Sequence, residues 1–207
     1  MKNNSNLDTG MTQWECVFMR IFLLVLILIF SLQSWTKADD ISELEIEGIS
    51  IGDSALDFFS RKQISKYVYD FKSDEFKSSD IHSSNFKTYD AIQINYKPND
   101  KNYTIYGISG MIVYENNIAE CYKKQKKIIM DMKRDLKIIR IRDDGTYAHP
   151  DDNTGNSKVT STYLFFENGD YVQIKCYNWS VESGYTDHLR IGLMTKELGD
   201  FYSNKAY

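Results

Sequence analysis

Residues 162–178 read TYLFFENGDYVQIKCYN, and this stretch is the clearest indication of the fold. Residues 162–167 and 170–178 have the composition of strands, and Asn168-Gly169 between them favours a type I′ turn. Three residues of the second strand alternate and should share one buried face, namely Val172, Ile174 and Cys176. The stretch therefore predicts an antiparallel hairpin with one side in the core.

Further strands are predicted on both sides of this hairpin. Residues 43–51 alternate between apolar and polar side chains, and residues 88–96 and 103–114 form a second hairpin across the turn formers KPNDKN. Short strands are also expected at 136–141 and around Leu189, Ile191 and Leu193. The polar stretches 70–85 and 142–157 are predicted to be surface connections.

The longest predicted helix covers residues 117–136, where apolar side chains recur at helical spacing and Asn117 can cap the first turn. A shorter helix should begin near Asp53 or Ser54, and another at Thr195. Hairpins dominate the strand order, so a parallel doubly wound fold is disfavoured. We expect an α+β fold in which an antiparallel sheet carries one long amphipathic helix and shorter helices packed on it.

The N-terminus is typical of a secretory signal peptide. Residues 21–30 read IFLLVLILIF, which is too short to span a bilayer, and Ala38 ends a plausible cleavage site. Met19-Arg20 makes a better start than Met1, so the first residues are interpreted as an over-extended start. The sequence thus predicts a signal peptide over 1–38 and a single exported domain over 39–207, which is periplasmic or secreted and has no integral membrane span after cleavage.

Charge and cysteine content limit the possible partners of residues 39–207. This part of the chain has 22 basic and 27 acidic residues and no nucleic-acid-binding motif, so no nucleic acid is expected as a partner. Cys121 and Cys176 are its only cysteines and would meet an oxidising compartment. They are predicted to form a disulfide, and the alternative is two buried free thiols.

Positive charge is concentrated on the long predicted helix. Between Lys123 and Arg142 there are nine basic residues and two acidic ones. Six of these cations form what we call the basic helix face, a candidate surface for an envelope protein or an anionic surface: Lys123, Lys126, Lys127, Lys133, Arg134 and Lys137. The alternative is an ordinary solvated helix face.

Two overlapping motifs raise the possibility of serine hydrolase chemistry. Residues 48–52 read GISIG, a literal G-x-S-x-G, and residues 52–56 read GDSAL, which resembles the first block of the GDSL hydrolases. That resemblance implies Ser54 as the nucleophile, with Ser50 as the other candidate. The family's aspartate three residues before its histidine is missing before both His149 and His188, so a helix cap is the preferred interpretation of Ser54.

Other site chemistry is weakly indicated. The three histidines are widely separated and no metal-ligand spacing occurs, so neither a metal nor a cofactor is predicted. The loop 151–156 departs from the calcium-loop pattern and is interpreted as a solvated turn. All 15 tyrosines follow residue 38, and Trp179 is the only tryptophan there. Aromatic surfaces bind sugars and peptides, so a ligand-binding module is a further hypothesis that requires these rings to line a pocket.

Residues 47–59, EGISIGDSALDFF, and the closing DFYS at 200–203 resemble uncharacterised exported proteins of small-genome marine bacteria. The resemblance implies export and no known activity. Our leading expectation is a non-enzymatic exported protein that binds an envelope component or partner through the basic helix face. The alternative is a small secreted, GDSL-like serine hydrolase that uses Ser54.

Overall fold

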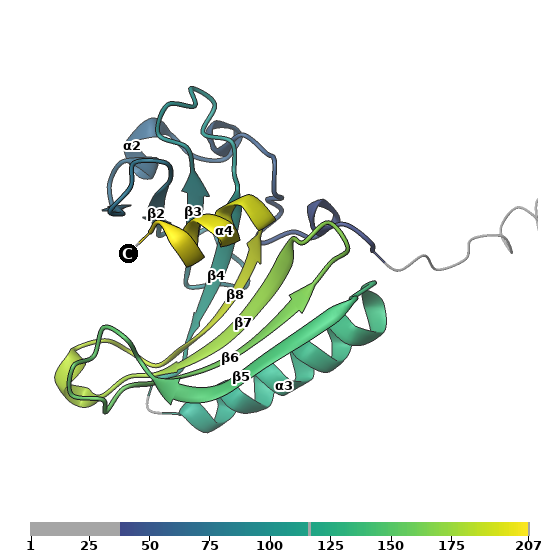
Figure 1. Ribbon diagram of the computed structural model, residues 1–207. Helices are drawn as coiled ribbons and strands as arrows, with labels where there is room; N and C mark the ends of the chain where they lie inside the picture. Colours follow the sequence, from purple (N-terminus) through teal and green to yellow (C-terminus); the bar gives the residue numbers. More distant parts are fainter. Residues whose placement is uncertain (1–37, 116, 207) are drawn as a thin grey trace, which may run out of the picture. The chain divides into compact units, whose positions relative to one another are not determined.

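The computed structural model describes residues 38–115 and 117–206, in which an eight-stranded antiparallel sheet carries helices (Figure 1). The predicted signal peptide lies outside the described residues, apart from Ala38. The strand order is β1-β2-β3-β4-β8-β7-β6-β5, and every neighbouring pair is antiparallel. The strands are β1 (Val68–Asp70), β2 (Lys77–Ile81), β3 (Ala91–Tyr96), β4 (Gly107–Val113), β5 (Arg140–Ala148), β6 (Lys158–Phe165), β7 (Tyr171–Asn178) and β8 (His188–Met194).

The predicted antiparallel sheet with one long helix is therefore confirmed. Helix α3 (Ile118–Asp135) packs on β7 and β8, and α4 (Lys196–Asn204) follows β8 directly. Asn117 occupies the N-cap position of α3, but its side chain makes no capping hydrogen bond. The shorter elements are η1 (Ile41–Glu43), η2 (Ala55–Asp57), α2 (Arg61–Ile64) and η3 (Val181–Ser183).

Alternation along the strands gives the sheet two different faces. The core face, which α3 covers at β7 and β8, consists of buried apolar side chains that include Ile92, Ile94, Ile108, Val172, Ile174, Leu189 and Leu193. The opposite face, which we call the open face, includes Gln93, Tyr163, Lys175, Tyr177 and Arg190. At one end of the open face, Leu198 and Phe201 of α4 form a second apolar cluster with Phe76 and Met194.

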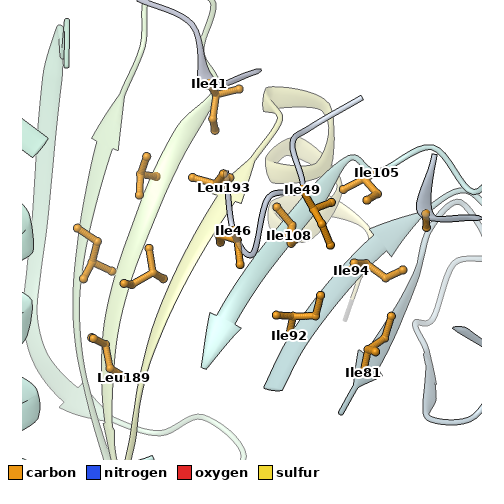
Figure 2. Close-up of a cluster of buried hydrophobic side chains, with 14 of the residues drawn as sticks. Ile41, Ile46, Ile49, Ile81, Ile92, Ile94, Ile105, Ile108, Leu189 and Leu193 are labelled. Carbon is orange, nitrogen blue, oxygen red and sulfur yellow. The ribbon is translucent and has the colours of Figure 1, made fainter. Parts of the chain in front are cut away.

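The N-terminal segment covers part of the core face, but the strand predicted over 43–51 is wrong. Ile46 and Ile49 instead exchange backbone hydrogen bonds of 3.0 and 3.1 Å across a tight turn, in which Glu47 and Gly48 have φ of 55° and 78°. The Glu47 carboxylate accepts hydrogen bonds from three backbone N–H groups of residues 87–89, which fixes this turn. Figure 2 shows Ile41, Ile46 and Ile49 among the isoleucines and leucines of the sheet.

Two stretches predicted to be surface connections contain strands. Residues 70–85 include β2, whose outer partner β1 completes one edge of the sheet. The predicted strand 136–141 and loop 142–157 are replaced by β5, which runs from Arg140 to Ala148 at the other edge. An edge strand has only one paired neighbour, and β5 is exposed along nearly its whole length, so its sequence has the polarity of a loop.

The β6–β7 hairpin is confirmed, but its turn differs from the predicted type I′. Of the residues in this turn only Gly169 has a positive φ, at 90°, whereas a type I′ turn requires two. The backbone N–H of Gly169 bonds to the carbonyl of Phe166, and the N–H of Phe166 bonds to the carbonyl of Asp170. This is a type I turn followed by a glycine bulge.

The predicted disulfide between Cys121 of α3 and Cys176 of β7 is confirmed. Their Cα atoms lie 6.0 Å apart, and both residues are fully buried. The bond fastens the long helix to the core face and is compatible with an oxidising compartment. Among the described residues, none of the helices has the length and apolar character needed to cross a membrane.

Candidate functional site

Two cavities indent the open face and meet at its centre. One, of about 500 Å³, is lined by Tyr163 and Tyr171 among others, and we call it the tyrosine lobe. The second, of about 660 Å³, is lined by Trp179 and Tyr185 among others, and we call it the tryptophan lobe. Each volume is in the usual range for a small-molecule site. The lobes join along residues that line both: Tyr69, Gln93, Lys175, Tyr177 and Arg190.

A pair of cations lies where the lobes join. Lys175 on β7 and Arg190 on β8 are directly opposite each other in the strand register, and both side chains are half-buried. Neither forms an ion pair with a carboxylate in residues 38–115 and 117–206. Like charges in this position destabilise a sheet. We call the two lobes together the hollow. Its centre is therefore positively charged, and the repulsion between the two cations lowers the stability of the fold.

Lys175 is surrounded by tyrosines. Its Nζ lies 5.4 Å from the centre of the Tyr163 ring. Burial by itself lowers the pKa of the Lys175 ammonium, but the hydroxyl groups of Tyr177, Tyr163 and Tyr147 outweigh burial and raise that pKa. Lys175 therefore keeps its positive charge at neutral pH.

Arg190 is oriented by an amide. Its Nη1 donates to Oε1 of Gln93 at 3.1 Å, and Nε2 of Gln93 donates to Oδ1 of Asp80 at 2.8 Å. The guanidinium is thus connected to a carboxylate only through Gln93. The Nε–H group of Arg190 is buried and has no acceptor among the described residues. A planar guanidinium held in this way can present donors to a carboxylate or a phosphate.

A third cation stands at the edge of the tyrosine lobe. Arg142 of β5 lies opposite Tyr163 in the strand register, and its guanidinium is 4.1 Å from the centre of the Tyr163 ring. It differs from the central pair because it is exposed and its Nε is 3.2 Å from a carboxylate oxygen of Asp144. Arg142 therefore adds less uncompensated charge than Lys175 or Arg190.

The tryptophan lobe contains a cluster of five rings. Trp179 lies 4.3 Å from His149 and 4.7 Å from Tyr185 between ring centres, and Tyr177 stacks on His188 at 4.5 Å. Nδ1 of His188 is 2.9 Å from the carbonyl oxygen of Thr186, which can only accept, so Nδ1 carries the proton. Burial lowers the pKa of His188 to about 4, so this imidazole is neutral at pH 7.

The serines of the hydrolase hypothesis lie elsewhere and are engaged by the backbone. Oγ of Ser54 donates to the carbonyl of Asn102 at 2.7 Å and accepts from the N–H of Leu56, so Ser54 caps η2. Oγ of Ser50 donates to the carbonyl of Leu44 at 3.1 Å. Within the described residues neither hydroxyl bonds to an imidazole, and no group of three or more histidine, cysteine or acidic side chains could hold a metal ion.

The basic helix face is exposed, but much of its charge is paired locally. All six of its cations are exposed to solvent. Ion pairs to acidic residues on or beside α3 involve four of them: Lys123 with Glu120, Lys127 with Asp131, Arg134 with Asp131 and Asp135, and Lys137 with Asp39. Exposed pairs of this kind add little stability, but they reduce the positive potential of the surface.

Sequence reasoning missed the cations of the open face and anticipated its rings. Pairs such as Lys175 and Arg190 become recognisable only when β7 and β8 are known to be neighbours. The hypothesis of a ligand module required that tyrosines and Trp179 line a pocket, and they do. No family model matches the chain, and neither the curated proteins nor the solved structures contain a match.

Proposed function

We propose that the protein is a non-enzymatic, exported binding protein that holds a small anionic ligand in the hollow of the open face. The observation that carries this proposal is the pair Lys175 and Arg190, which face each other and form no ion pair with a carboxylate of residues 38–115 or 117–206. A bound anion would neutralise both side chains. The N-terminal apolar segment and the disulfide support export to a periplasmic or secreted location.

The hollow is favoured over the basic helix face as the binding surface for two reasons. Its central cations have no carboxylate partner among the described residues, whereas most cations of the basic helix face have one. It is also concave and lined by aromatic rings, which is how small-ligand sites exclude water. Attachment of an envelope component to the basic helix face is the competing proposal.

Calorimetric titration with citrate and with inorganic phosphate tests this proposal. Lys175→Met should weaken citrate binding by roughly 10- to 100-fold, since a hydrogen bond to a charged group contributes about 1.5–3 kcal/mol. Lys126→Met is the matched control, because Lys126 is an exposed lysine of the basic helix face that forms no ion pair within the described part of the chain. It should leave citrate affinity unchanged.

The two variants also discriminate between the competing surfaces. A loss of binding in Lys126→Met with normal binding in Lys175→Met would transfer the function to the basic helix face. If neither citrate nor phosphate binds the unmodified protein, the proposal of an anion site fails.

A further inference from the structure

We propose that the anionic ligand is an acidic oligosaccharide, with an acidic group at Lys175 and Arg190 and a neighbouring sugar ring in the tryptophan lobe. This inference rests on the proposed function and goes further by naming the ligand class. It follows from what lies on each side of the cation pair, from the polar groups near the rings, and from the length of the hollow.

The first observation is that aromatic rings flank the cations on both sides. Tyr163 and Tyr171 line one lobe and Trp179 and Tyr185 the other, while Tyr177 lines both. The face of an aromatic ring is electron-rich and attracts the weakly positive C–H groups on the face of a pyranose. A ligand whose acidic group is attached to sugar rings therefore binds more tightly, because these rings can contact the aromatic side chains of either lobe.

The second observation is that the tryptophan lobe contains carboxylates as well as rings. Asp80 and Asp151 line it, together with Gln93. The side-chain carboxylate of Asp151 has no hydrogen-bond donor among the described residues, although the backbone N–H of Asp151 bonds to Nδ1 of His149. Carboxylates only accept hydrogen bonds, so they match ligand hydroxyl groups and repel a second acidic group. This combination favours a hydroxylated sugar ring over a bare aromatic acid.

The third observation is that the two lobes continue into each other. The cation pair lines both of them, so an acidic group bound there has a cavity on either side. A single sugar would leave one lobe filled with water. The hollow therefore fits a chain of at least two sugars better than a monosaccharide.

Calorimetry with four probes tests this inference, namely glucuronosyl-xylotriose, which joins one acidic sugar to three neutral ones, glucuronate, uncharged xylotetraose and 4-hydroxybenzoate. Glucuronosyl-xylotriose should bind at least tenfold more tightly than each of the others. Trp179→Leu should reduce glucuronosyl-xylotriose affinity roughly tenfold, which corresponds to one stacking contact, and leave citrate affinity unchanged.

Two further variants test whether a loss of ligand affinity comes from a folding defect or from the removal of any exposed ring. Tyr185→Leu removes an exposed ring that lies tilted against Trp179, so it should weaken glucuronosyl-xylotriose binding without affecting the fold. Phe58→Leu is the matched control, because Phe58 is exposed and lines neither lobe.

The outcomes separate this inference from the proposed function. If citrate binds through Lys175 but glucuronosyl-xylotriose binds no more tightly than glucuronate, the anion site stands and the saccharide inference is overturned. Equal binding of xylotetraose, or tighter binding of 4-hydroxybenzoate, would overturn it as well. If no probe and no small anion binds, both proposals fail.

Discussion

The two faces of the sheet are built from the same strands, and they use alternate residues for opposite purposes. On β7, Ile174 is fully buried in the core face, while the next residue, Lys175, lies in the hollow of the open face. The core face consists of buried apolar side chains, and a disulfide joins it to helix α3. The open face sets two cations opposite each other and leaves buried polar atoms without partners among the described residues.

The difference shows that apolar packing and charge are separated residue by residue along the same strands. Apolar burial on the core face supplies the favourable free energy of folding. The repulsion between Lys175 and Arg190 lowers the free energy of unfolding, and apolar packing on the other side of the same strands compensates for it. Perturbing each face in turn should therefore change stability in opposite directions.

The largest expected effect comes from the disulfide of the core face. Replacing Cys121 and Cys176 with alanine should lower the free energy of unfolding by about 4 kcal/mol, because the bond closes a loop between residues 55 positions apart. Urea unfolding followed by circular dichroism measures the loss. A reducing agent should destabilise the unmodified protein by a similar amount and leave the double variant unaffected; equal stability of the two proteins would contradict a structural role for the bond.

A smaller effect is expected from His188 at the edge of the open face. Its pKa is about 4 in the folded protein and about 6.5 in the unfolded chain, so the unfolded chain binds more protons between these values. The stability due to neutral His188 is fully present above pH 6.5 and is lost as the pH falls to 4, by on the order of 3 kcal/mol.

Comparison with His188→Asn isolates this contribution, since asparagine keeps a short donor for the carbonyl of Thr186. His149, whose pKa is also lowered by burial, and Asp80 remain in both proteins and cancel in the difference. Denaturation at a series of pH values should give curves that converge toward pH 4. Parallel curves between pH 6.5 and 4 would show that His188 does not titrate abnormally.

The core face could be predicted from the sequence because its pattern is local. Val172, Ile174 and Cys176 alternate over five residues, and Cys121 recurs at helical spacing with the other apolar residues of α3, so the pairing of the two cysteines followed. By contrast, the short and polar β2 and the exposed β5 lack that alternation. Their pairing depends on neighbours far away in the sequence, so residues 70–85 and 142–157 have the polar pattern of loops.

The proposed binding site could not be predicted from the sequence for a related reason. Lys175 and Arg190 are 15 positions apart and adjacent only through the β7–β8 register. The sequence instead drew attention to the basic helix face, where cations are close together in the chain and are mostly paired with nearby acids. Local density of charge is visible in a sequence, whereas the absence of a counter-charge is a property of the fold.

The smallest expected effect is the most direct test of the difference between the two faces, because a variant on each face should change the free energy of unfolding in opposite directions. Arg190→Met should raise the free energy of unfolding by about 1 kcal/mol, since it removes the cation that faces Lys175 together with a buried Nε–H group that has no acceptor among the described residues. Ile174→Val on the neighbouring strand should lower it by roughly 0.5–1.5 kcal/mol through the methyl group it removes from the core face. Urea unfolding without a ligand measures both. A destabilised Arg190→Met protein would mean that the hydrogen bond from Arg190 to Gln93 stabilises the fold more than Lys175 repels the guanidinium, and the open face would then support the fold in the same way as the core face.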